Sequence, residues 1–97
     1  MLLNDIYDAQ QRVYAIDEQT IPPYSQVFVK CSVTPSEQIA NAFCTEMNVR
    51  LFEEKGLLVS RAILDLNQSS QFMLIANTTH QDVNIYPHEW LASLEVF

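Results

Sequence analysis

The stretch "TIPPYSQVFVK", residues 20 to 30, decides the fold class, because two prolines stand directly before a run in which apolar and polar residues alternate. Proline fixes its own φ and pushes the preceding residue toward extended geometry. Pro22 and Pro23 also donate no backbone hydrogen bond, which suits the start of a strand or the edge of a sheet. The alternation after them predicts a strand. We expect Val27, Val29, Cys31 and Val33 on one face of it, and Phe28, Lys30 and Ser32 on the other.

Similar short segments recur at regular spacing along the chain, with polar or proline-containing turns between them. Residues 72–76 are almost continuously apolar, so that strand is expected to be buried on both faces. Regularly spaced short strands predict an all-β fold, a compact antiparallel barrel or sandwich of six to eight short strands. We predict further strands at residues 12–16, 48–52, 57–66, 72–76, 83–85 and 90–97, and turns at 34–36, 53–56, 67–70, 77–80 and 86–89.

Residues 36–47 leave two alternatives open. Ser36 fits the N-cap of a short helix, in which Ile39, Ala42, Phe43 and Met47 follow helical spacing. The surrounding β-rich pattern favours a strand instead, since tertiary context overrides a local pattern of this kind. The predicted fold class therefore includes one optional short helix near residues 36–47.

The composition is that of one folded domain over residues 1–97, with residues 1–11 as a flexible or peripheral N-terminal segment. Hydrophobic residues make up 48% of the chain and charged residues 18%, whereas disordered chains are poorer in apolar residues and richer in charge. No apolar run reaches the length of a transmembrane helix. The start, "MLLNDIYDAQQ", lacks the basic region and long apolar stretch of a secretory signal, so we expect a cytoplasmic protein.

The charge of the chain argues against two classes of partner. Twelve acidic residues outnumber five basic ones, which gives a formal net charge of −7. Nucleic-acid phosphates and anionic membrane surfaces would both be repelled, so we predict no nucleic-acid partner and no membrane partner. Cys31 and Cys44 lack C-x-x-C spacing and sit among apolar neighbours. They are interpreted as two reduced cysteines that serve as small core residues.

The polar residues predict no catalytic, cofactor-binding or metal site. A metal site would need His80 and His88 together with nearby carboxylates or a cysteine, and both histidines fall in turns. Glu53 and Glu54 would suit an acid/base pair, but a solvated turn, with Lys55 or Arg50 as ion-pair partners, is the favoured interpretation. For Arg61 two interpretations stay open, a strand residue facing solvent or a buried partner of a carboxylate such as Glu95.

Aromatic residues near the ends of the predicted strands also allow two interpretations. They either seal the two ends of a barrel or form an exposed patch at a subunit contact, where aromatic residues carry much of the binding energy. The residues in question are Tyr24, Tyr86, Trp90 and Phe97.

Three quoted stretches together resemble a known type of segment. "TIPPYSQVFVKCSV", "EEKGLLVSRAIL" and "QFMLIANTTHQDVNIYPHEWLASLEVF" look like the segment between the protease and the reverse transcriptase in Pol polyproteins of gypsy-type LTR retrotransposons. The match spans about residues 12 to 97. The matching elements are Ile21, Pro22, Pro23 and Ser25; Gly56, Leu57, Leu58, Val59 and Arg61; Asn77; and Leu94 and Glu95.

The layout also resembles the β-barrel of trimeric dUTPases, with a proline-rich strand entry and a closing hairpin at Asn77, Ile85 and Leu91 to Leu94. That resemblance implies a dUTPase-like barrel. The sequence departs from the enzyme where chemistry is required, because Gly56 is the only glycine and glycine-rich phosphate loops are therefore absent. Ser60-Arg61 also lacks a following glycine. The resemblance thus implies a degenerate, non-catalytic form of the fold, with no cofactor.

The predicted function is a non-catalytic structural or interaction module of retroelement or retroelement-derived polyprotein type that associates with itself. The alternative is a module retained from a dUTPase-like ancestor that binds or hydrolyses a nucleotide. The C-terminal strand is apolar and is expected to have an open edge, which invites pairing with another chain. We therefore expect a homo-oligomer, a trimer rather than a dimer, because the related dUTPases use C-terminal segments between subunits. The predicted interface residues are Trp90, Leu91, Leu94, Val96 and Phe97.

Overall fold

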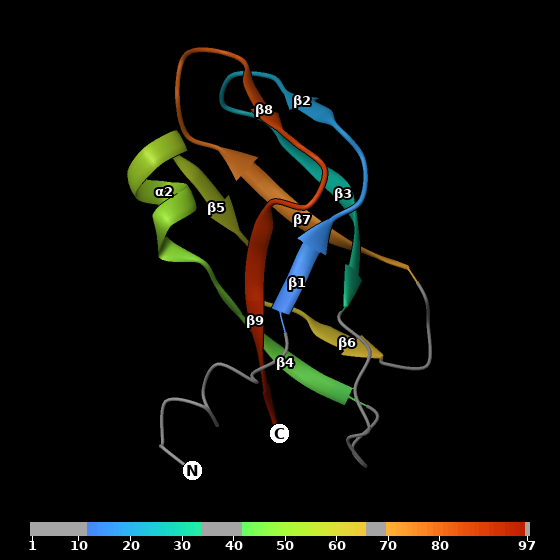
Figure 1. The fold of residues 1–97 in the computed structure, drawn as a ribbon. Coiled ribbons are helices and arrows are strands. Elements are labelled where there is room, and N and C mark those ends of the chain that lie inside the picture. Colours follow the sequence, from blue (N-terminus) through green and yellow to red (C-terminus); the bar gives the residue numbers. More distant parts are fainter. Residues whose placement is uncertain (1–11, 34–41, 66–69, 97) are drawn as a thin grey trace, which may run out of the picture.

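The computed structural model of the chain describes residues 12–33, 42–65 and 70–96 (Figure 1). These residues form strands almost throughout, with one short helix. The elements are β1 (Arg12–Ala15), β2 (Gln19–Ile21), β3 (Gln26–Val33), β4 (Ala42–Met47), α2 (Val49–Lys55), β5 (Leu57–Val59), β6 (Ile63–Asp65), β7 (Gln71–Asn77), β8 (Val83–Ile85) and β9 (Trp90–Val96).

The main sheet curls into a nearly closed antiparallel barrel. Its strands follow the order β5-β7-β3-β1-β9-β4-β6, and residues 60–62 join β5 at one end of this order to β6 at the other. Residues 57–65 are therefore one bent segment whose first half pairs with β7 and whose second half pairs with β4. Counted in this way, the barrel has six strands, and the predicted all-β barrel is confirmed.

Thr45 holds the bend between β5 and β6. Its backbone N–H donates to the carbonyl of Ala62 at 2.9 Å, and its hydroxyl accepts from the N–H of Ala62, also at 2.9 Å. Thr45 is 1% exposed, so these bonds form away from water, where a missing partner would be costly. The bend is thus fixed where the segment leaves one neighbour for the other.

The two-stranded β2–β8 sheet lies at one end of the barrel, and β4 and β6 lie at the other (Figure 1). Ile21 and Ile85 are fully buried and belong to the same cluster as the barrel interior, so this small sheet closes its end of the core. The buried apolar residues are Val13, Ala15, Ile21, Val29, Cys31, Leu51, Leu57, Val59, Met73, Ile75, Ile85, Leu91, Ala92 and Leu94.

The cysteine interpretation is confirmed for Cys31, which is fully buried. Burial raises the pKa of its thiol to about 11, because a thiolate would lose its hydration inside the barrel. Cys31 is therefore a core residue with little thiolate at neutral pH. The side chain of Cys44 lies outside the described part of the structure.

The expectation that β7 is buried on both faces is wrong. Met73 and Ile75 point into the barrel and are 1% and 0% exposed, whereas Phe72 on the opposite face is 60% exposed. A barrel strand has one inner and one outer face, and no second layer of described residues covers the outer face of β7. A continuous apolar run therefore does not identify a strand with two buried faces here.

The predicted strand at residues 48–52 and the predicted turn at 53–56 are also wrong, because these residues form α2 and its caps. Asn48 caps the helix, its side-chain oxygen accepting from the N–H of Arg50 at 3.2 Å. Gly56 ends it in the left-handed region, with φ of 70°. Leu51 is the one buried residue of α2, so the helix covers the barrel with a single apolar side chain. The combination of a capping Asn and a terminating Gly was the missed signal.

The optional helix near residues 36–47 does not extend over residues 42–47, which form β4 between β9 and β6. Pairing on both sides favours the strand there over the local helical spacing. The expectations for residues 1–11, the turns at residues 34–36 and 67–69, and Phe97 all lie outside the described residues.

The prolines stand in a turn rather than at the start of a strand. β2 comes before them and pairs with β8, and β3 begins after them. Tyr24 has a positive φ of 51°, which the alternation after the prolines does not reveal. The strand that follows is confirmed as β3, with Val29 and Cys31 buried and Phe28 and Lys30 exposed.

The expected open edge of the C-terminal strand is wrong. β9 lies between β1 and β4 and pairs with both. Opposite β1 it carries a bulge at Leu91, because Val13 faces Ala92 whereas Tyr14 faces Trp90. The extra residue shifts the alternation, so the adjacent residues Leu91 and Ala92 are both fully buried.

Two substitutions in β7 test the position of the core. Ile75→Ala should lower the free energy of unfolding by about 2–5 kcal/mol, because it leaves a cavity among fully buried neighbours. Phe72→Thr is the matched control and should change it by about 0.5 kcal/mol or less, since an exposed side chain leaves no cavity. Urea denaturation in dilute protein measures both values. Equal effects of the two substitutions would contradict this arrangement of β7.

Candidate functional site

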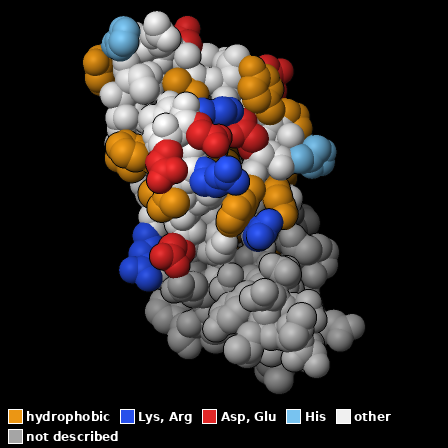
Figure 2. Space-filling model, turned by 60° about the vertical axis from the view of Figure 1, so that its left-hand side comes forward, with side chains coloured by type: hydrophobic (Ala, Val, Ile, Leu, Met, Phe, Trp, Pro, Cys, Tyr) orange, Lys and Arg blue, Asp and Glu red, His pale blue; other side chains and the backbone are white. Residues whose placement is uncertain are grey.

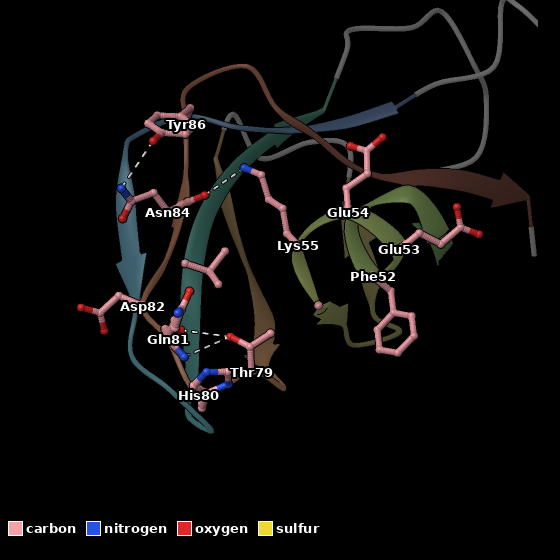
Figure 3. Close-up of a pocket in the computed structure, with 12 residues that line it drawn as sticks. Phe52, Glu53, Glu54, Lys55, Thr79, His80, Gln81, Asp82, Asn84 and Tyr86 are labelled. Atoms are coloured by element: carbon pink, nitrogen blue, oxygen red, sulfur yellow. Dashed lines mark hydrogen bonds between the residues drawn. The ribbon is translucent and has the colours of Figure 1, made fainter.

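An open groove of about 720 Å³ lies between the end of α2 and the loop that joins β7 to β8 (Figure 3). Residues 52–56 form one wall, and residues 79–84 together with Tyr86 form the other. Three local features position these walls, namely the caps of α2, the buried side chain of Asn77 and the ammonium of Lys55.

The N-terminal cap of α2 ties the helix to the bulge of β9. The side chain of Asn48 donates to the carbonyl of Trp90 at 3.0 Å, and its backbone N–H donates to the carbonyl of Leu91, also at 3.0 Å. The helix therefore begins at the irregular point of β9. Asn48 satisfies two carbonyls at this point, beside the bulge, and the N–H of Arg50 at the helix start.

The C-terminal cap of α2 is docked against the β7–β8 loop. The carbonyl of Gly56 accepts from both the N–H and the hydroxyl of Thr78, at 3.0 and 2.7 Å. A side chain at position 56 would collide with the Cγ2 methyl of Thr79. Gly56 is thus required by its positive φ and by the close approach of the loop. The sole glycine of the chain serves packing, and no phosphate-binding loop.

Asn77, at the end of β7, is the buried polar centre of this corner, with 2% exposure. Its side-chain amide donates to the carbonyls of Ile21, Pro22 and Gln81 at 2.9, 3.1 and 2.7 Å. Its side-chain oxygen accepts from the N–H and the hydroxyl of Thr79 at 2.9 and 2.8 Å. Every polar atom of this side chain is therefore used to hold backbone, and none is left for a ligand.

Lys55 reaches across the groove from α2 (Figure 3). Its ammonium donates to Oε1 of Glu89 at 2.6 Å and to the carbonyl of Asn84 at 2.9 Å. It also lies 5.0 Å from the centre of the Tyr86 ring. The same carboxylate oxygen of Glu89 accepts from the N–H of Tyr86 at 2.9 Å. Lys55 is thus a clasp between α2 and the turn after β8, since its charge is already compensated within the chain.

The charges around the groove disfavour a polyphosphate ligand. Lys55 is the one Lys or Arg among the residues that line it, whereas Glu53, Glu54 and Asp82 are all acidic. Figure 2, which brings the α2 side forward, shows charged side chains of both signs gathered there, with apolar side chains around them. An anion entering the groove would meet carboxylates, while the single cation is held by Glu89.

The structure does not bring the sequence-predicted polar candidates together into a site. His80 and His88 are exposed and lie in different turns, and the described residues contain no group of three potential metal ligands. Glu54 forms an exposed pair with Arg50 at 3.8 Å, a contact of little energetic weight. Glu53 is also exposed, as expected of a solvated residue, although it lies on a helix.

Arg61 is exposed. This exposure contradicts the interpretation of Arg61 as a buried partner of a carboxylate. Arg61 faces solvent, although it lies in the bend between β5 and β6 and not within a strand. The side chain of Glu95 lies outside the described part of the structure.

The aromatic candidates divide between the two interpretations. Tyr24 and Tyr86 are 73% and 49% exposed, so they do not seal the ends of the barrel. Trp90 is half-buried beneath the guanidinium of Arg12, which lies 4.1 Å from the ring centre, and its indole N–H donates to the carbonyl of Ala92 at 3.0 Å. Trp90 is therefore engaged within its own chain. Of the other predicted interface residues, Leu91 and Leu94 are core residues at 0% and 3% exposure.

The structure reveals a surface that sequence reasoning missed. Five residues on the outside of strands β5, β7 and β3 form an outer apolar face, defined as Leu58, Phe72, Leu74, Ala76 and Phe28. The signal was present in the sequence as a phenylalanine on the polar side of β3 and as the continuous apolar run of β7. Both patterns were interpreted in terms of burial, and a patch that remains exposed was not considered.

The docking of Gly56 against Thr79 can be tested by a double substitution. Gly56→Ala should lower the free energy of unfolding by about 1–3 kcal/mol, because the new methyl overlaps the loop and the backbone has positive φ. Thr79→Ser removes the colliding methyl but keeps the hydroxyl that bonds Asn77. Gly56→Ala should therefore cost less in the Thr79→Ser background, leaving mainly the backbone strain. Equal costs in the two backgrounds, measured by urea denaturation, would rule out the close contact.

Comparison with known proteins does not identify a family for this chain. No protein-family model matches the chain, and no curated protein matches it. The resemblance to the retrotransposon segment therefore stays a prediction, and the function is inferred from the groove and the outer apolar face. Among the described residues, no helix is long and apolar enough to cross a membrane.

Proposed function

We propose that this chain is a non-catalytic interaction module of retroelement polyprotein type that associates with itself in the cytoplasm. The observation that carries this proposal is the number of large apolar side chains that are exposed on the outside of the molecule, apart from those that form its core. Among the described residues, seven such side chains are between 42% and 73% exposed: Tyr24, Phe28, Val49, Phe52, Leu58, Phe72 and Tyr86. Exposed apolar side chains that gather into a patch mark interaction surfaces.

The use of the motif residues supports a structural role. Asn77 bonds the carbonyls of Ile21 and Pro22, its backbone N–H donates to the carbonyl of Ser25 at 2.8 Å, and its neighbour Thr78 bonds Gly56. The first and second stretches of the resemblance thus meet the third at one corner of the molecule. A motif whose polar atoms satisfy one another serves to shape the fold, and it leaves no donor aimed at a substrate.

Self-association can be measured directly. The weight-average mass from light scattering should rise with protein concentration from that of one chain toward that of an oligomer, because the exposed apolar area is buried on association. The concentration range should extend to about 1 mM, so that a weak dimer with a Kd near this value is also detected. If the mass stays at that of a single chain over the whole range, self-association is rejected.

The alternative nucleotide-binding function receives no support from the groove and has its own test. Titration of the chain with a non-hydrolysable dUTP analogue and Mg²⁺ in a calorimeter should give no saturable heat, since carboxylates line the groove and its lysine is engaged. Incubation with dUTP and Mg²⁺ should yield no dUMP above a control without protein. A trimeric dUTPase run in parallel confirms the reagents. Saturable binding that disappears in Lys55→Met would establish the groove as a nucleotide site, and dUMP formation would overturn the non-catalytic proposal.

A further inference from the structure

The outer apolar face is continuous across three paired strands. Phe28 of β3 lies directly opposite Leu74 of β7, and Leu58 of β5 lies directly opposite Ala76 of β7. Phe72 lies opposite Lys30, which is two residues beyond Phe28 along β3 and therefore on the same face. Partners in register on one face of a sheet have their Cβ atoms about 5 Å apart. The five apolar side chains therefore form one surface.

The three strands that carry this face contain few charges, although the protein is acidic. Lys30 is the single charged residue in the three described strands β3, β5 and β7, although the chain as a whole carries a formal charge of −7. The carboxylates of Glu53 and Glu54 lie on α2, and those of Asp82 and Glu89 lie in loops. Two copies of the chain that approach through this face therefore bring no carboxylate of these three strands together.

The size of the face matches the apolar centre of a small dimer interface. Phe28 and Phe72 are 65% and 60% exposed, which leaves about 250 Å² of aromatic surface in water if a whole aromatic side chain counts about 200 Å². Leu58, at 42% exposure, adds to this. A small specific interface buries about 600 Å² per partner, of which about 60% is apolar. The face therefore supplies most of the apolar area that one partner needs.

The closure of the barrel decides how a second copy can bind. β9 and the bent segment 57–65 leave no long unpaired edge among the described barrel strands, so addition of a strand at an edge is not available to most of the sheet. Packing of one sheet face on another is the remaining way to bury β3 and β7. A face that meets its own copy about a twofold axis gives a closed dimer, and two packed sheets lie about 10 Å apart.

We propose that the outer apolar face binds the same face of a second copy of this chain, which gives a twofold dimer centred on Phe28 and Phe72. This inference rests on the proposed self-association and replaces the C-terminal strand as its surface. Lys30 lies opposite Phe72 and is exposed, and the stem of a lysine can cover apolar surface while its ammonium stays in water.

The test is sedimentation equilibrium or light scattering of the whole chain and three variants. Wild-type protein should show a monomer–dimer equilibrium, and Phe28→Thr/Phe72→Thr should raise the dimer Kd by about tenfold or more, since buried aromatics dominate interfaces. Threonine keeps the strand propensity. Phe52→Ala removes another exposed aromatic, which lies on α2 (49% exposed), and should leave Kd within about twofold.

Salt provides an independent readout of the same contact. Raising NaCl from about 0.05 to about 0.5 M should lower Kd, because salt screens repulsion between two acidic chains. A contact made by ion pairs would weaken instead. Lys30→Glu places an acid on the face and, like the double variant, should raise Kd. If the double variant proves less thermally stable than wild type, the Kd of Lys30→Glu decides whether the face forms the contact.

Each outcome separates this inference from the proposed function. If wild-type protein is monomeric at every concentration, self-association fails, and the face assignment fails with it. If wild type dimerises but the double variant and Lys30→Glu retain its Kd, the face assignment is overturned while self-association stands. A trimeric mass, or tighter binding at low salt, would overturn the twofold apolar contact and leave self-association in place.

Discussion

The buried side chain of Asn77 is the constraint on which the rest of this structure depends. A carboxamide at 2% exposure is costly unless its donors and acceptor are paired, and here one side chain joins three backbone carbonyls to the loop after β7. Through Ile21 it places β2, and through Thr79 it places the residue against which Gly56 and the end of α2 pack. The end of the barrel is therefore closed by polar bonds as well as by apolar contact.

The pairing of polar atoms distinguishes two surfaces of the protein, the groove and the outer apolar face. In the corner around Asn77 and in the Lys55 clasp, donors and acceptors satisfy one another, and the ammonium of Lys55 is held by Glu89 and Asn84. The groove between them is a consequence of packing and has an acidic lining. The outer apolar face differs because nothing in the described part of the chain compensates its exposed area. The proposed function therefore rests on unburied apolar surface, and not on an unused polar group.

Local patterns in the sequence predicted much of the fold. The alternation in residues 26–33 is a property of the backbone period, so β3 and its inner face followed from it directly. The same holds for β1 and β8 and for the confirmed barrel class. The helix α2 was missed because Val49 and Leu51 alternate with polar neighbours as in a strand, and only Asn48 and Gly56 at its two ends indicate a helix. No candidate polar site was expected, and the groove is formed by residues from segments that no local pattern connects.

The sequence by itself determined most of the strands, among them β1, β3, β7 and β8, since side chains alternate at a period that neighbouring residues set. It also determined the acidic charge and the lack of glycine loops. The tertiary structure alone decided which strand faces are covered, because coverage depends on partners distant in the chain. β9 contains no sign that β1 and β4 flank it, and β7 contains no sign that its outer face stays bare. Pairing with β1 and β4 covers both edges of β9, which the sequence had suggested as the surface for association. The outer face of β7 is exposed, although its apolar composition would assign it to the core.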